Sequence, residues 1–294
     1  MAKETSKTPK GFMLRMPPQL HESVASAANK SSRSINAEII ARLEASFMSG
    51  VVQRLNWVLE QLLAVMGKDQ VSISIIAEAV HEDTASRLER VFAGQEEAPF
   101  KLLDAIADYS GVCSKWLKHG AGAPFEIELL NHYGKETGVQ LISEQPEATI
   151  IIRSDSAFGQ ICLVQKFSNR SWKTYNTRLH LSDRVGAGGQ IDQAAFSNAC
   201  RILYRDNKTR LHGYILEHQL FEKIVSGEVH PLAVLGDVKR SFWVDDWWDP
   251  AMFGEKNSPD EYWEGYAAFC QGVYWYLMED KQLRQELEEI KSGH

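Results

Sequence analysis

The chain contains few of the residues that build covalent or metal-bound scaffolds. Only 4 of its 294 residues are cysteines. They are widely separated and form no CxxC pair: Cys113, Cys162, Cys200 and Cys270. This spacing excludes a disulfide framework and a cysteine zinc site, so we expect reduced thiols in a cytoplasmic protein.

Long apolar runs are also missing. No stretch approaches the ~20 apolar residues that a membrane-spanning helix requires, and the first ten residues, MAKETSKTPK, lack the apolar core of a signal peptide. A hydrophobic content of 44% nevertheless indicates a folded chain. We therefore expect a protein that has no membrane partner.

Motifs for catalysis and cofactors are missing as well. The run Gly186–Gly189 (GAGG) matches neither GxxxxGK[ST] nor GxGxxG, and we expect a flexible turn there. A self-cleaving serine–lysine domain would need a lysine base after Ser156, but no lysine occurs between Lys173 and Lys208. The histidines of the C-terminal half show no spacing typical of metal sites: His180, His212, His218 and His230. We predict no catalytic residue, no metal and no cofactor, and hence no enzyme.

Charge is unevenly distributed along the chain. The formal net charge is −7, yet residues 1–50 carry seven Lys and Arg against four Asp and Glu. Residues 126–294 carry 18 Lys and Arg against 25 Asp and Glu. A basic N-terminal segment favours contact with phosphates, and an acidic remainder keeps the rest of the molecule away from them.

Residues 12–47 have the pattern of one strand followed by two helices. Phe12–Met16 alternates as a strand does, a helix follows Pro17-Pro18, and the polar break at 29–32 precedes a second helix that starts at Ser34. A unit this small cannot bury a stable core alone, so we expect a dimer whose two strands pair into one ribbon. Such a ribbon fits the major groove of B-DNA.

The outward face of this strand supplies candidate base contacts. Phe12, Leu14 and Met16 share the core face, which leaves Gly11, Met13 and Arg15 toward the groove. Arg15 can donate two hydrogen bonds to guanine, while Met13 offers apolar contact to a thymine methyl group.

Further residues are suited to holding the DNA backbone. Ser34 occupies the N-cap position of the second helix and Asn36 lies in its first turn, where free N–H groups bind phosphate. Lys10 belongs to a basic arm with Lys3 and Lys7. These contacts would fix the register while the ribbon reads bases.

The segment resembles the ribbon-helix-helix repressors of the Arc and Mnt type found in phages. The resemblance rests on Phe12–Pro17 (FMLRMP) and Arg33–Ile39 (RSINAEI), and on Arg33, Glu38 and Arg42, which match a buried Arg–Glu–Arg triad. It departs from that family at Gly11 and Met13, where polar residues are usual. The alternative is a ribbon-helix-helix used for dimerisation alone.

The centre of the chain has the apolar spacing of short helices. One helix is expected over 51–66, and four more at about Ser74–Val80, Asp83–Phe92, Pro99–Tyr109 and Ser114–Lys118. Gly94 and Gly111 act as stops. Together they predict a compact all-α bundle over 51–125.

This bundle resembles the helix-turn-helix domains of lambda-repressor and Cro-like proteins. The resemblance rests on Ile76–Val80 (IAEAV), Leu103–Val112 (LDAIADYSGV) and Trp116-Leu117. It implies a second DNA-reading module, with these contacts: Thr84, Ser86, Arg87 and Arg90. The alternative is a domain for packing or dimerisation, because the expected recognition helix opens with the carboxylates of Glu82 and Asp83.

The C-terminal half changes to short strand-like runs after a helical linker expected at 126–140. Strands are expected at 149–152, 160–166, 172–175 and 212–216, and helices near 192–203 and 217–226. Twelve aromatic residues from Phe242 to Tyr276 indicate a core and dimer contact, with a ligand pocket or a protein interface as the alternative.

The combined prediction is a multidomain chain. It has a ribbon-helix-helix domain over 1–50, a central helix-turn-helix bundle over 51–125, a linker over 126–147 and an α+β domain over 148–294 that oligomerises or senses a signal. We expect a transcription regulator, most simply a repressor, of bacterial, phage or mobile-element origin. It would bind double-stranded DNA as a homodimer or higher oligomer.

Two other functions stay open from the sequence. The first is an antitoxin-like interaction module that regulates its own operon and binds a protein partner through its C-terminal half. The second is a small ligand bound by that half.

Overall fold

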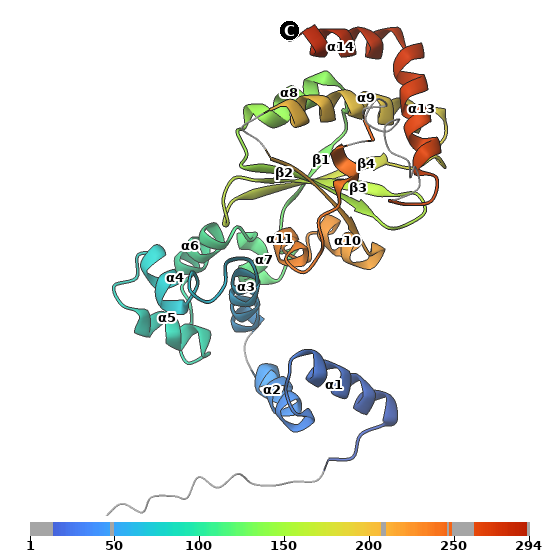
Figure 1. The fold of residues 1–294 in the computed structure, drawn as a ribbon. Coiled ribbons are helices and arrows are strands. Elements are labelled where there is room, and N and C mark those ends of the chain that lie inside the picture. The colour runs from blue at the N-terminus through green and yellow to red at the C-terminus, as the bar shows by residue number, and fades with distance from the viewer. Residues whose placement is uncertain (1–13, 48–49, 207–209, 246, 249–261, 293–294) are drawn as a thin grey trace, which may run out of the picture. The chain divides into compact units, whose positions relative to one another are not determined.

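The computed structural model describes residues 14–47, 50–206, 210–245, 247–248 and 262–292 (Figure 1). The chain divides into two compact units, residues 1–49 and 50–294. The candidate DNA contacts Lys10, Gly11 and Met13 lie outside the described residues.

The first unit contains the two expected helices. Helix α1 spans Pro18–Lys30 and helix α2 spans Ile35–Phe47, separated by the predicted polar break. Proline at the start of α1 fits a first turn in which no backbone N–H is needed. Residues 14–17 form no strand within the single chain. The ribbon prediction stays untested, because its pairing requires a second chain and residues 12–13 of its strand are not described.

Five short helices open the second unit, close to their predicted positions. They are α3 (Gly50–Met66), α4 (Ile73–Ala79), α5 (Ala85–Phe92), α6 (Phe100–Ser110) and α7 (Ser114–His119). The signals are local: Ser72 Oγ accepts a hydrogen bond from Ile75 N at 3.2 Å, and Gly111 ends α6 at φ 70°. Their apolar faces meet in one core around Leu55, Ile76 and Leu88.

A five-stranded mixed sheet forms the C-terminal part. Its strands are β1 (Ile127–Leu130), β2 (Ala148–Ser154), β3 (Gln160–Lys166), β4 (Trp172–His180) and β5 (Arg210–Leu216). The order is β1-β4-β3-β2-β5, and β3 runs antiparallel to the other four. The β3–β4 hairpin turns at Ser168-Asn169, where two short polar residues suit a tight turn.

Helices cover both faces of this sheet, which gives a three-layer arrangement (Figure 1). The first face carries α8 (Lys135–Ser143), α9 (Ala187–Arg205) and α13 (Tyr266–Glu279), and α14 (Lys281–Ser292) packs on α9. The second face carries α10 (His218–Val225) and α11 (Pro231–Leu235). Alternating side chains divide accordingly, with Ile151 and Leu163 on the first face and Ile152 and Val164 on the second.

Two sequence predictions about this part are wrong. Residues 127–130, expected within a helical linker, form the edge strand β1 and pair in parallel with β4. The pairing partner lies more than 40 residues downstream, so no local pattern reveals it. Gly186–Gly189 is not a flexible turn, because Gly186 is the N-cap of α9 and the next three residues form its first turn.

Much of the aromatic cluster is core, as predicted, but Phe242, Tyr274 and Trp275 are 57%, 49% and 55% exposed. Trp243 and Trp247 of the segment around the short 3-10 helix η1 (Phe242–Asp245) are fully buried with Tyr266 and Phe269. Phe253 lies outside the described residues. This packing assigns most of the described aromatics to stability rather than to a pocket.

The helical bundle and the sheet meet through shared aromatic side chains. Trp172 of β4 packs against both the bundle core and the second-face core of the sheet. Its ring lies 3.8 Å from that of His230 and 5.6 Å from that of Phe125, measured between centroids. The two parts of residues 50–294 are therefore packed together rather than strung on a linker.

None of the described helices is both long and apolar enough to cross a membrane. No cluster of three or more metal-ligating side chains occurs within the same residues.

Candidate DNA-binding surface

The start of α2 is fixed by local hydrogen bonds. Ser32 adopts a left-handed φ of 53°, and Arg33 N donates to Ala28 O at 2.8 Å, which closes the end of α1. Ser34 Oγ then accepts from Ala37 N at 3.1 Å. This side-chain cap confirms the predicted N-cap position.

The Arg33–Glu38–Arg42 triad comes together in the structure. Arg42 Nε donates to Glu38 Oε1 at 3.0 Å, and Arg33 Nη1 lies 3.9 Å from Glu38 Oε2. Ser31 Oγ also donates to Glu38 Oε2 at 3.2 Å. The Arg42 hydrogen bond is the main reason that the pKa of Glu38 is lowered. The carboxylate thus joins the inter-helix turn to α2 and orients the helix start.

The described candidate contacts of this unit all face solvent. Arg15, Ser34 and Asn36 are exposed, as a DNA-facing role requires. Ser34 and Asn36 lie together at the start of α2, whereas Arg15 precedes α1. Their contacts with DNA remain predictions.

The same unit exposes much of its apolar surface. Leu14, Leu20 and Ile40 are 46–50% exposed, whereas Val24 and Ala28 are buried. Large apolar side chains on so small a unit need another surface to cover them. A second chain is the simplest cover and agrees with the predicted dimer.

The second candidate surface is the turn between α4 and α5. His81 has a φ of 61°, and Glu82 N donates back to Ala77 O at 2.9 Å. Thr84 is the N-cap residue of α5, without a side-chain cap bond. Thr84 and Ser86 are exposed, as a contact with DNA would require.

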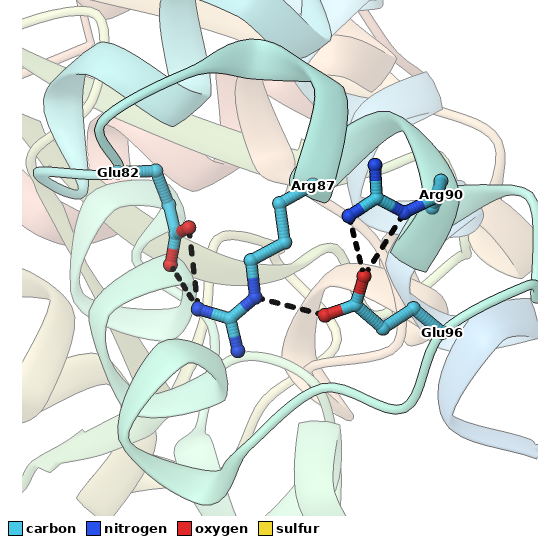
Figure 2. A network of polar contacts seen from close by, with 4 residues as sticks. All are labelled: Glu82, Arg87, Arg90 and Glu96. Atoms are coloured by element: carbon cyan, nitrogen blue, oxygen red, sulfur yellow. Dashed lines mark hydrogen bonds and ion pairs between the residues drawn. The ribbon is translucent and has the colours of Figure 1, made fainter.

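Arg87 and Arg90 of α5 are held by two glutamates (Figure 2). Arg87 Nε donates to Glu96 Oε1 at 2.9 Å and its Nη1 to Glu82 Oε1 at 3.2 Å. Arg90 donates to Glu96 Oε2 through Nη2 at 2.9 Å and Nε at 3.1 Å. The hydrogen bond to Glu96 raises the pKa of Arg87, and the bond from Arg87 lowers that of Glu96. We call these four residues the arginine–glutamate network.

The surface around this network is acidic. Residues 73–97 contain six carboxylates and two arginines, and both arginines are already paired. Sequence reasoning anticipated the repulsion from Glu82 but missed Glu96. The available signal was Gly94, which ends α5 in a left-handed turn and brings the chain back past the helix. The predicted DNA contacts of α5 stay untested.

Comparison with known proteins supports the first unit alone. The family model of the Arc-like DNA binding domain matches residues 5–53. Domains of this kind bind DNA and usually act as dimers. The match ends within the first turn of α3 and covers neither the rest of the central bundle nor the sheet. No curated protein and no solved structure matches this chain.

Proposed function

We propose that this chain is a sequence-specific DNA-binding transcription regulator that represses its target, of bacterial, phage or mobile-element origin. The observation that carries the proposal is the Arc-like match over residues 5–53. The capped start of α2 and the Glu38–Arg42 pair support it, because both orient a helix N-terminus suited to phosphate.

In this proposal two chains pair through their N-terminal strands. The exposed apolar side chains of α1 and α2 provide the contact between the chains, and the paired strands enter the major groove. Arg15 reads a guanine with its two-pronged guanidinium, while Ser34 and Asn36 hold the flanking phosphates. The protein therefore acts as a dimer or a higher oligomer of dimers.

The test is a footprint of the full chain on the DNA upstream of its own gene, compared with two variants at Arg15. Arg15→Ala should cost about 1–3 kcal/mol and relax selectivity at one base position. Arg15→Lys is the matched control, because it keeps the charge but loses the paired hydrogen bonds. We expect Arg15→Lys to lose selectivity while its salt dependence remains that of the wild type.

Two results would contradict this proposal. Operator binding by Arg15→Ala that equals the wild type would show that the ribbon is not the reader. A wild-type protein that protects no DNA would contradict the regulator role and favour a role in binding a protein partner alone.

A further inference from the structure

In the arginine–glutamate network, glutamates already bind Arg87 and Arg90, the two cationic side chains that α5 would offer to DNA. Arg90 uses Nε and Nη2 on one oxygen of Glu96, and Arg87 uses Nε on the other. Arg87 Nη1 also contacts both oxygens of Glu82, at 3.2 and 3.3 Å. A phosphate would have to compete with two carboxylates for these guanidinium groups.

Backbone turns hold both carboxylates in place. Glu82 follows the left-handed His81 at the end of α4, and its N–H is bonded to Ala77 O. Glu96 follows the left-handed Gly94 at the end of α5, where Gln95 N donates to Arg90 O at 2.8 Å. Because each glutamate is anchored by its own helix end, the carboxylates are pre-organised against the arginines.

We propose that Glu82 and Glu96 are negative determinants of DNA binding in this chain. By holding Arg87 and Arg90, they keep α5 off the phosphate backbone and leave sequence reading to the N-terminal unit. The inference rests on the proposed function in that DNA is the ligand. It goes further, because it assigns the central bundle a surface that disfavours DNA.

The arginine–glutamate network is not a major source of folding stability. The side chains of Arg87 and Arg90 are 38% and 50% exposed, and exposed ion pairs contribute little to folding. Changing the glutamates should therefore leave the fold intact, so that effects on DNA binding can be interpreted. The remaining carboxylates of this face, which include Glu78 and Asp83, add repulsion toward phosphate.

The test uses the full chain and a duplex of random sequence. The double variant Glu82→Gln/Glu96→Gln keeps the side-chain shape but removes the charges that hold the arginines. The matched control, Glu89→Gln/Glu97→Gln, removes two charges from the same segment. In the described structure Glu89 and Glu97 hold no arginine.

The measured quantity is the slope of log affinity against log salt concentration. Two released arginines should steepen it by about 1.8 per protomer, since each neutralised phosphate contributes ~0.9. The gain in affinity per protomer should then shrink about twelvefold between 50 and 200 mM salt. The control should leave the slope as in the wild type, because it releases no cation.

The gain in DNA affinity should disappear when Arg87→Ala/Arg90→Ala is added to the Glu82→Gln/Glu96→Gln variant. The same arginine changes in the wild-type chain should alter DNA binding little. An unchanged slope in the glutamate variant, with its circular dichroism intact, would overturn the inference. So would an equal change in the control. Operator binding by Arg15→Ala is scored separately, so a failure of the ribbon is distinguishable from a failure of this inference.

Discussion

His230 should make the second unit sensitive to mild acid. Its ring packs against Trp172 and Phe125, and it is almost fully buried. Nδ1 accepts a hydrogen bond from Leu232 N at 3.1 Å and caps α11, so the ring proton resides on Nε2. Nε2 is buried and has no hydrogen-bond partner in the described part of the chain. A second proton would therefore bury a charge and break the cap.

The direction of this pH dependence follows from the pKa of His230. Burial lowers the pKa of His230 to about 3, compared with ~6.5 in an unfolded chain. Between these values the unfolded chain takes up a proton that the folded chain refuses. The contribution to stability is thus complete above pH ~6.5 and is lost as the pH falls toward 3. At pH 5 this difference removes about 2 kcal/mol of unfolding free energy.

The assay is urea unfolding followed by tryptophan fluorescence at pH 7 and pH 5. The test variant is His230→Asn, which keeps an acceptor at the helix cap but cannot titrate. Its stability is lower at both pH values, since a packed ring is lost, but the drop from pH 7 to pH 5 should be about 2 kcal/mol smaller than in the wild type. Burial also lowers the pKa of His212. His212 is present in the wild type and in His230→Asn, so its effect on stability cancels when the two proteins are compared.

A control separates titration from simple loss of packing. Phe221→Leu disturbs the second-face core of the sheet but leaves His230 in place. It should retain the full pH dependence of the wild type. If the His230→Asn protein loses as much stability between pH 7 and pH 5 as the wild type does, the burial argument for His230 is refuted.

Two further predictions concern backbone geometry and helix packing. His81→Gly should stabilise the protein by about 1 kcal/mol in chemical denaturation, because φ is 61° there and glycine adopts it without strain; equal or lower stability would contradict this. Gly138→Ala should destabilise it by about 1–3 kcal/mol in the same assay, because a Cβ would lie 2.9 Å from Ala199 O and 3.0 Å from Ile202 Cβ, where α8 and α9 touch. A free energy of unfolding equal to the wild type would show that α8 and α9 can shift apart enough to accept the methyl group.

Elements with local signals could be predicted from the sequence. Proline at the start of α1, Ser34 at the start of α2 and Gly111 at the end of α6 each act on their own neighbours. The apolar spacing of the five central helices is equally local. For the same reason the candidate residues Ser34 and Asn36 were placed correctly on the exposed start of α2.

Features that depend on distant partners could not be predicted in this way. Strand β1 exists because β4 pairs with it, and four residues of sequence carry no trace of that partner. The contact of Glu96 with Arg87 spans nine residues and depends on the turn at Gly94. The ribbon itself requires a second chain, so the roles of Met13 and Arg15 rest on pattern and resemblance.

Trp172 has a consequence for how this protein can be rearranged. One indole completes the helical bundle and the second face of the sheet, and it lies so close to Gly111 that a Cβ there would come within 2.8 Å of the ring. Exchanging the bundle for an unrelated one would leave this tryptophan, and His230 beside it, facing the wrong surface. Residues 50–294 thus pack as one unit, so replacing the bundle alone would remove packing partners of Trp172.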